Sequence, residues 1–321
     1  MNDNPLVLVL TSPGDTRLPF EAELRTMAEI VVGESARDFV TAAAEAEIIL
    51  NWSGSLALLR EVFLESPRVR WIHSRSAGLE QVLFPELVKS AVTLTNGSGV
   101  FSASLGEFAM AAILYFAKDL RRMIRNQQAG VWEPFDVTMI EGKTLGIVGH
   151  GSIGREVAVR ARALGMNVIS VRRRASQKSD PLVRMYGADQ LREMLSESDY
   201  IVVTLPLTEE TRGKIGEAEF AVMKKGAVVI NLGRGPTIDE QALIRALSEG
   251  RIRGAALDVF DEEPLPQGHP FYSLENVLLS PHCADHTSDW LDNAMRFFLA
   301  QLQRFRRGEA LLNLVDKKAG Y

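Results

Sequence analysis

Short apolar runs alternate with amphipathic stretches along most of the chain, a pattern typical of strands that are each followed by a helix. In the first hundred residues the strand-like runs are Leu6–Leu10, Glu47–Asn51, Val69–Ser74 and Val92–Thr95. A second series of runs begins at Thr144, Asn167, Tyr200, Ala227, Gly254 and Asn276. Alternation of this kind favours parallel sheets covered by helices on both faces. We therefore expect an α/β protein with two doubly wound parallel sheets.

Three helical segments carry further signals. Ser102–Ala117 is apolar almost all round, which predicts a buried helix that bridges two domains or two subunits. Thr237 and Glu240 stand three apart ahead of a short helical stretch with Gly250 beyond it, which predicts a capping box and a glycine stop. The amphipathic run Thr287–Arg306 predicts a final helix.

Length and composition narrow the class of protein. A chain of 321 residues exceeds one typical domain, so two domains that share a cleft are expected. The net charge of -5 argues against a nucleic-acid-binding or acidic-lipid-binding surface, and no apolar run approaches the length of a membrane span. The single cysteine, Cys283, excludes an internal disulfide and is too few for a structural zinc site, so we expect no metal. We expect a cytoplasmic protein.

A glycine-rich turn follows the apolar run that begins at Thr144. The turn, Gly149–Gly154, reads GHGSIG and precedes an amphipathic stretch. Between a strand and a helix, glycines at this spacing let a pyrophosphate approach backbone N–H groups at the positive end of the helix. The sequence therefore predicts a dinucleotide site, with cofactor contacts from the residues Gly149, Gly151, Ser152, Ile153 and Gly154.

Three arginines stand at the end of the next predicted strand, Asn167–Val171. NAD-specific folds usually place an acidic residue there, on the ribose hydroxyls, but this chain has Arg172, Arg173 and Arg174. Guanidinium groups can pair with a 2′-phosphate, so we expect NADP(H) as the cofactor and NAD(H) to be less favoured. The alternative interpretation is a solvated basic loop.

Three polar residues follow later predicted strands, at the edge where open α/β sheets bind their ligands. They are Arg234 in INLGRGP, Glu263 in DVFDEEP and His282 in LLSPHCAD. Taken singly, each has a structural interpretation: an ion pair, a solvated turn and a capped loop. Together with a hydride cofactor they form a set of arginine, acid and imidazole that suits the reduction of a carbonyl group.

At these motifs the chain resembles the D-isomer-specific 2-hydroxyacid dehydrogenases over nearly its full length. The segments that carry the resemblance are SAGLEQVL, NGSGVFS with Glu107 downstream, EGKTLGIVGHGSIGREVA, LPLTEETRGKIG, INLGRGPTIDEQALIRAL, GAALDVFDEEPLP and NVLLSPHCA. Two departures from the family pattern stand out. Arg172 replaces the usual acid, and CADHTSDW follows the imidazole where small residues and glycine are common.

The resemblance implies a role for each matching residue. Arg234 would bind the substrate carboxylate and carbonyl, His282 would be the acid/base, and Glu263 would be its carboxylate partner. The backbone of Ala77 and Gly78 would bind the substrate carboxylate. Leu205, Pro206, Leu232 and Asp258 would line the cofactor, the last two near the nicotinamide. The resemblance also implies a flavodoxin-like substrate domain split into residues 1–100 and 287–321, with a Rossmann cofactor domain, 101–286, inserted in it.

The function expected from these features is NADPH-dependent reduction of a small 2-keto acid to the D-2-hydroxy acid by a homodimer. Glyoxylate and hydroxypyruvate are the leading substrates by resemblance, and Trp52, Arg75 and Trp132 are candidate specificity residues. A dinucleotide-sensing corepressor of the same fold is the main alternative. Formate dehydrogenase is disfavoured because His282 is present, and phosphoglycerate dehydrogenase because it commonly carries an additional regulatory domain.

Overall fold

The computed structural model describes residues 4–14, 18–172 and 183–320, and it divides into two compact units. The first unit comprises Met1–Phe101 together with Ser288–Tyr321, and the second comprises Ser102–Thr287. In the described part of the chain, none of the helices combines the length and the apolar character needed to cross a bilayer.

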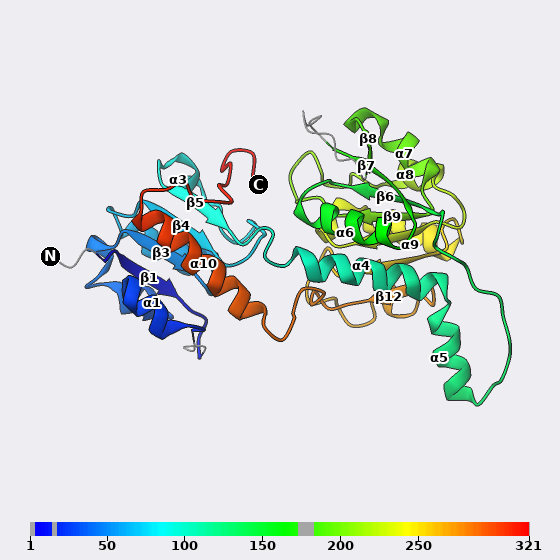
Figure 1. Cartoon of the computed structure of the whole chain (residues 1–321), viewed down its shortest axis with the longest axis horizontal. Coiled ribbons are helices and arrows are strands. Elements are labelled where there is room, and N and C mark those ends of the chain that lie inside the picture. The colour runs from blue at the N-terminus through cyan, green and yellow to red at the C-terminus, as the bar shows by residue number, and fades with distance from the viewer. Residues whose placement is uncertain (1–3, 15–17, 173–182, 321) are drawn as a thin grey trace. The chain divides into compact units, whose positions relative to one another are not determined.

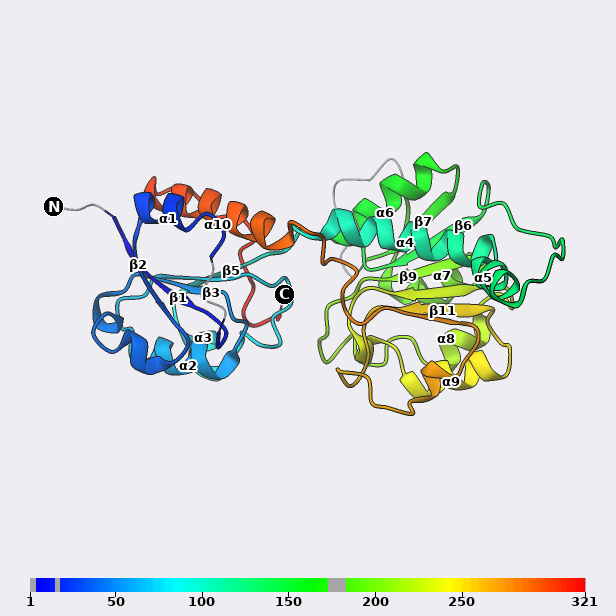
Figure 2. The same cartoon turned by 90° about the horizontal axis from the view of Figure 1, so that it is seen from below.

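The first unit is built on a five-stranded parallel sheet with the strand order β2-β1-β3-β4-β5. Helices α1 and α10 cover one face and α2 and α3 the other (Figure 2). This is the flavodoxin-like order, as expected. The strands are β1 (Leu6–Leu10), β2 (Glu29–Gly33), β3 (Ile48–Asn51), β4 (Trp71–Ser74) and β5 (Thr93–Asn96). The helices are α1 (Glu21–Met27), α2 (Leu56–Leu64), α3 (Pro85–Lys89) and α10 (Trp290–Arg306), with short 3₁₀ turns at Ala36–Phe39 and Ala43–Glu45.

The second unit has a seven-stranded parallel sheet with the order β12-β11-β10-β9-β6-β7-β8, which is the Rossmann arrangement extended by one strand (Figure 1). The fold class predicted from the sequence is thus confirmed. The strands are β6 (Thr144–Val148), β7 (Asn167–Val171), β8 (Arg184–Tyr186), β9 (Tyr200–Val203), β10 (Val228–Asn231), β11 (Gly254–Leu257) and β12 (Val277–Leu279). The helices are α4 (Ser102–Ala117), α5 (Leu120–Ala129), α6 (Ser152–Ala163), α7 (Leu191–Glu197), α8 (Glu217–Val222) and α9 (Glu240–Ser248), with 3₁₀ turns at Ala188–Gln190, Gly235–Thr237 and Pro270–Tyr272.

Helix α4 begins and ends where the sequence pattern predicts. Its apolar side chains belong to the core that α6 and the sheet also build, and the two helices approach closely at Gly106. A Cβ atom at Gly106 would lie 3.2 Å from the Cβ of Glu156 on α6. Most of α4 is therefore covered within its own unit, so its apolar character does not by itself require a second subunit.

Two predicted helix starts are wrong. The N-cap of α9 is Asp239, whose carboxylate accepts a hydrogen bond from the backbone N–H of Ala242 at 2.9 Å. Thr237 forms no capping box, because its hydroxyl donates to the carbonyl of Arg234 at 2.6 Å. Helix α10 begins at Trp290, three residues later than predicted. At α9 both the hydroxyl and the carboxylate make local hydrogen bonds, but only the carboxylate of Asp239 accepts from an N–H group in the first turn of the helix.

Candidate active site

The predicted glycine turn lies between β6 and α6 and has the geometry of a dinucleotide loop. Gly149 has φ 106°, a left-handed conformation that suits glycine, and its carbonyl accepts a hydrogen bond from Thr204 Oγ1 at 2.6 Å. A Cβ atom at Gly154 would lie 2.4 Å from the carbonyl oxygen of Gly149. Any larger residue at position 154 would therefore push the turn away from the helix.

The N-terminus of α6 provides room for an anion. Gly151 is the N-cap residue and makes no side-chain cap, so it blocks none of the first N–H groups of this twelve-residue helix. A Cβ atom placed on Gly151 would meet nothing within 4 Å, and both Gly151 and Ser152 are exposed. Open space beside free N–H donors at the positive end of a helix fits a pyrophosphate.

The loops after β9 and β10 lie against each other beside this turn. Leu205 and Pro206 follow β9, and Leu232 follows β10 and is 3% exposed. A Cβ atom at Gly233 would stand 2.5 Å from the carbonyl oxygen of Leu205, so only glycine permits this approach. The residues that the resemblance assigned to the cofactor thus occupy neighbouring loops at the carboxyl edge of one sheet.

Arg172 directly follows β7 and its side chain is exposed. Its backbone N–H donates to the carbonyl of Tyr186 on β8, which holds the backbone of Arg172 beside that strand. Arg173 and Arg174, the other two predicted phosphate ligands, lie outside the described residues. The structure therefore places one of the three arginines, at the end of the strand where the sequence predicted it.

Arg234 is half-buried in the loop after β10, and its Nη1 donates to the carbonyl oxygen of Gly233 at 2.7 Å. The next residue, Gly235, brings this loop against the one that follows β11. A Cβ atom there would lie 2.0 Å from the carbonyl carbon of Phe260. The backbone carbonyl of Arg234 accepts from Thr237 Oγ1 and Asn231 Nδ2, so the base of the arginine is held on two sides.

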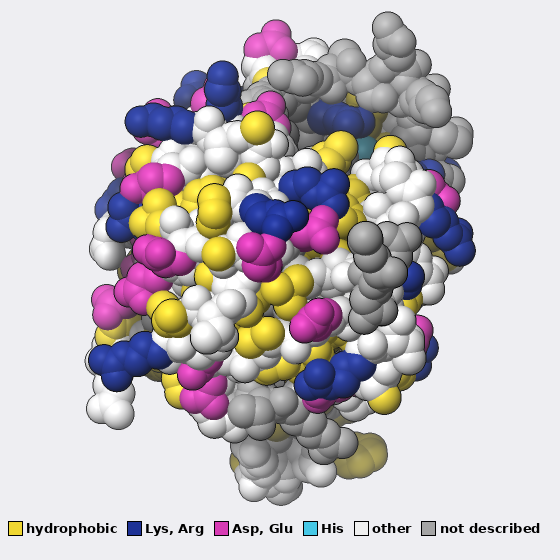
Figure 3. All heavy atoms as spheres, turned by 90° about the vertical axis from the view of Figure 1, so that its left-hand side faces the viewer, with side chains coloured by type: hydrophobic (Ala, Val, Ile, Leu, Met, Phe, Trp, Pro, Cys, Tyr) yellow, Lys and Arg dark blue, Asp and Glu magenta, His cyan; other side chains and the backbone are white. Residues whose placement is uncertain are grey.

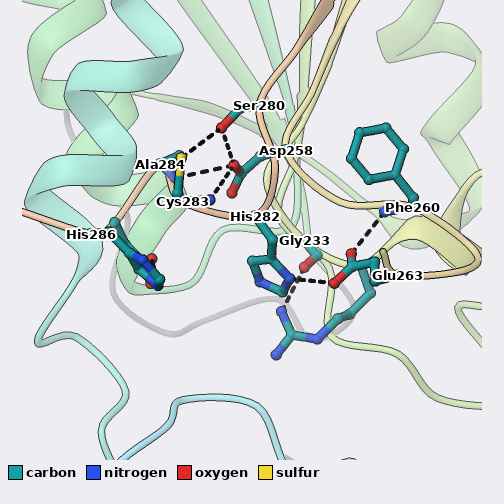
Figure 4. A network of polar contacts seen from close by, with 11 residues as sticks. Gly233, Asp258, Phe260, Glu263, Ser280, His282, Cys283, Ala284 and His286 are labelled. Atoms are coloured by element: carbon teal, nitrogen blue, oxygen red, sulfur yellow. Dashed lines mark hydrogen bonds and ion pairs between the residues drawn. The ribbon is translucent and has the colours of Figure 1, made fainter. Parts of the chain in front are cut away.

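Glu263 and His282 form a directly hydrogen-bonded pair (Figure 4). His282 Nδ1 lies 2.6 Å from Glu263 Oε2, while Glu263 Oε1 accepts a hydrogen bond from the backbone N–H of Phe260 at 2.9 Å. Both carboxylate oxygens are therefore engaged, and the imidazole uses one nitrogen to bind Glu263. The side chain of His282 remains 44% exposed, which leaves its other nitrogen, Nε2, for a ligand.

A buried carboxylate holds the loop that carries the imidazole. Asp258 Oδ1 accepts hydrogen bonds from Ser280 Oγ at 2.5 Å and from the backbone N–H groups of Cys283 and Ala284 at 3.0 and 3.1 Å (Figure 4). His282 itself has φ 51°, in the left-handed region. Burial raises the pKa of Asp258, although these hydrogen bonds and the nearby imidazole act in the opposite direction.

Sequence reasoning missed Ser280, although its position directly before Pro281 at a strand end could have suggested a structural hydroxyl. The backbone N–H partners of Asp258 have no sequence signal at all. Because three donors converge on one oxygen, we infer that Asp258 and Ser280 stabilise the strained turn at His282.

The other predicted residues divide between the two units. Ala77 and Gly78 lie in the loop after β4 of the first unit, where Asn96 Nδ2 donates to the carbonyl of Ala77 at 2.7 Å. Trp52, also in the first unit, is 1% exposed and belongs to the core. Trp132, in the second unit, is 96% exposed.

The sequence of the second unit matches a family model. The model, described as the NAD binding domain of D-isomer specific 2-hydroxyacid dehydrogenases, covers residues 110–284, more than half of the chain. The chain belongs to the D-isomer specific 2-hydroxyacid dehydrogenase family. The resemblance inferred from the sequence is thereby confirmed, and the glycine turn lies within the matched residues.

Relatives and solved structures of this family are similar to this protein over most of the chain. A glyoxylate reductase of Korarchaeum cryptofilum is 35% identical over 269 residues, which are 80% of this chain and 79% of the relative. A D-3-phosphoglycerate dehydrogenase of Methanocaldococcus jannaschii is 31% identical over 90% of this chain and 55% of its own length. An NADPH-dependent glyoxylate/hydroxypyruvate reductase of Sinorhizobium meliloti, solved with NADP and sulfate, is 27% identical with a TM-score of 0.84 and covers 99% of this chain and 100% of its own.

Proposed function

We propose that the protein reduces a small 2-keto acid to the D-2-hydroxy acid with NADPH. The observation that carries this proposal is the hydrogen bond of 2.6 Å between His282 Nδ1 and Glu263, in the same unit as the glycine turn. An imidazole oriented by a carboxylate can donate a proton from its outer nitrogen. The fold and the family are consistent with that chemistry.

The residues of the glycine turn would hold the cofactor. The N–H groups at Gly151, Ser152 and Ile153 would bind the pyrophosphate, and Gly149 and Gly154 would allow its close approach. The side chains or backbone of Leu205, Pro206, Leu232 and Asp258 would line the adenosine and nicotinamide portions. When bound, the cofactor supplies the hydride for the carbonyl carbon.

The proposed catalytic residues would stabilise the negative charge that develops on the carbonyl oxygen. His282 Nε2 would give its proton to that oxygen while Glu263 holds the ring in its orientation. Arg234 would bind the substrate carboxylate and polarise the carbonyl. By family resemblance, the backbone N–H groups of Ala77 and Gly78 would also bind a substrate carboxylate.

Preference for NADPH rests on Arg172 and its two neighbours. One guanidinium beside a phosphate near a protein surface contributes on the order of 1 to 4 kcal/mol at intermediate dielectric, or roughly one to three decades of selectivity. A structural relative from Xanthobacter autotrophicus, 28% identical over 99% of both chains with a TM-score of 0.85, was solved with NADPH.

Measurement of kcat/KM with both cofactors tests the preference for NADPH, and equal values would show that preference to be wrong. Arg172→Ala should weaken NADPH use and leave NADH use nearly unchanged.

Glyoxylate and hydroxypyruvate are the first substrates to assay, because relatives bear those names. A panel of 2-keto acids with NADPH, run on the wild type and on His282→Ala, tests the whole proposal. We expect kcat to fall by about two to four decades in the variant. A wild-type protein that binds NADPH and reduces no 2-keto acid would instead favour a dinucleotide-sensing corepressor.

The proposed partners are the small substrate and a second copy of the chain, and the proposed compartment is the cytoplasm. Acidic and basic side chains are interspersed on the face shown in Figure 3, and the net charge is -5, so we propose no nucleic-acid partner. The free thiol of Cys283 is exposed, which suits a reducing compartment.

A further inference from the structure

The carboxyl ends of β3 and β4 in the first unit carry buried polar side chains that the proposed chemistry does not use. Asn51 and Ser74 are register partners at the last positions of these strands, and both are fully buried. Within the described ranges, Asn51 Nδ2, Ser74 Oγ and the indole Nε1 of Trp52 have no hydrogen-bond partner. All three are donors, and a buried donor without an acceptor is costly. These donors lie too deep to bind a ligand directly, but their N–H and O–H dipoles add positive partial charge beneath the carboxyl ends of β3 and β4.

A cation is fixed beside these donors. Arg75 directly follows β4 and is half-buried, and its Cζ lies 5.0 Å from the ring centroid of Trp52 and 5.0 Å from that of Trp290. Contact with two indole rings restrains a planar guanidinium, whose N–H donors lie along the edge of the plane. The positive charge is thus held in one place at the strand end.

The loop that continues from Arg75 is the one to which the proposed function assigns the substrate carboxylate. Ala77 is two residues further on, so its Cα lies at most about 7 Å from that of Arg75. The loop is anchored, because Asn96 on β5 donates to the carbonyl of Ala77 at 2.7 Å. A substrate whose carboxylate binds Ala77 and Gly78 would extend its carbon chain next to the same loop.

We propose that Arg75 determines specificity by favouring 2-keto acids that bear a second anionic group, a carboxylate or a phosphate, on the carbon chain. The inference rests on the proposed function. A guanidinium can bind either group through two parallel hydrogen bonds, and the buried donors make the surrounding strand ends electropositive.

The test compares keto acids whose carbon chain bears a second anionic group with keto acids of similar length whose chain is otherwise neutral. Oxaloacetate and 3-phosphohydroxypyruvate are the probes with the anionic chain, and 2-ketobutyrate and hydroxypyruvate are those with the neutral chain. In the wild type, kcat/KM should be higher for at least one anionic probe than for its neutral counterpart. Arg75→Met should lower the ratio of kcat/KM for that anionic probe to kcat/KM for its neutral counterpart at least about tenfold. It should change kcat/KM for the acids with a neutral chain only a little, and Arg75→Lys should retain part of the wild-type ratio. The two anionic probes show whether the second group is a carboxylate or a phosphate.

Arg70 provides a matched control. It precedes β4 at the opposite end of the same strand, and its Cζ lies 5.0 Å from the ring centroid of Phe305 on α10. Arg70→Met should leave the ratio unchanged. An Arg75→Met variant that loses activity equally for all keto acids, or that keeps the wild-type ratio, would overturn the inference and leave a packing role. A wild type that reduces none of the four acids would instead refute the proposed function itself.

Discussion

At the scale of the residue, substitutions of Arg234 and His282 should have different effects on kcat and KM, because the two residues have different proposed roles. His282→Ala removes the proton donor but not the carboxylate ligand, so kcat should fall by about two to four decades with little change in KM. Arg234→Lys keeps the charge but loses the planar fork that can bind two oxygens at once. It should raise KM for the keto acid and lower kcat, while NADPH affinity stays nearly constant.

Steady-state kinetics and a fluorescence titration with NADPH separate these effects. If both variants showed the same change in KM and kcat, the separate roles of the two residues would be refuted. Full kcat in His282→Ala would refute the imidazole as the proton donor.

Ser280 should affect catalysis through the turn at His282 without touching the substrate. Ser280→Ala removes one of the three hydrogen bonds to Asp258 Oδ1, a loss of about 1 kcal/mol. If that energy holds the imidazole in place, kcat should fall by roughly threefold to tenfold with KM for NADPH unchanged. Ser273→Ala is the control, because Ser273 also donates to an oxygen, the carbonyl of Pro270, but is exposed. Unchanged kcat in Ser280→Ala would show that the turn holds without it.

At the scale of the element, the contact between β4 and α10 contains a buried histidine. His73 is 1% exposed, its Nδ1 lies 2.8 Å from Thr95 Oγ1, and its ring lies 5.4 Å from that of Phe298 on α10. Burial lowers the pKa of His73 to about 3. The folded protein therefore keeps this imidazole neutral at a pH where the unfolded chain, with a pKa near 6.5, already binds a proton.

The sign of the effect follows from that difference. Because the folded pKa is below the unfolded one, the contribution of His73 to stability is complete above about pH 6.5 and is lost as the pH falls toward 3. Between pH 7 and pH 5 the loss is about 2 kcal/mol. Urea unfolding of the wild type and of His73→Phe at both pH values measures it. The variant should lose about that much less stability than the wild type, and an equal loss in both proteins would contradict the prediction.

Every strand in the middle of each sheet could be predicted from the sequence, as could the edge strands β5 and β12, but two other edge strands were missed. The central strands are continuous apolar runs because helices cover both faces. The missed strands, Glu29–Gly33 and Arg184–Tyr186, each pair with one neighbour only. Arg184–Tyr186 has only three residues and two exposed side chains, too short for a periodic signal.

In the candidate site, too, some features could be predicted from the sequence and others could not. Strand ends and the glycine spacing predicted Arg234, Glu263, His282 and the cofactor turn, because parallel strands bring their carboxyl ends to one edge. The contact of Arg75 with Trp290 joins residues more than two hundred positions apart. The hydrogen bonds that Asp258 accepts from backbone N–H groups do not depend on which side chains the donor residues carry. Such contacts are set by tertiary packing and could not be read from a single sequence.

At the scale of the whole molecule, exposed apolar side chains gather on α5 and the segment after it. Helix α5 has no buried residue, and the segment that follows includes Trp132, 96% exposed, and Met139, 64% exposed. Arg122 on α5 pairs with Glu133, so the segment is tied to the helix. The other exposed apolar residues of this surface are Leu120, Met123, Ile124, Val131 and Val137. Apolar surface of this extent marks an interface more often than a free surface.

We expect a second copy of the chain to cover this surface, so the protein should sediment as a dimer at micromolar concentration. The α5 surface, rather than the buried helix α4, supplies the reason, and isologous pairing is the commonest symmetry of such contacts. Ile124→Glu combined with Trp132→Arg places charges in the interface and should shift the sedimenting species toward the 35.5 kDa monomer. Val40→Glu changes an apolar side chain that is 73% exposed in the first unit, so it should leave the dimer intact. A wild-type protein that remains a 35.5 kDa species at these concentrations would refute the dimer, and a dimer unaffected by the double substitution would place its interface elsewhere.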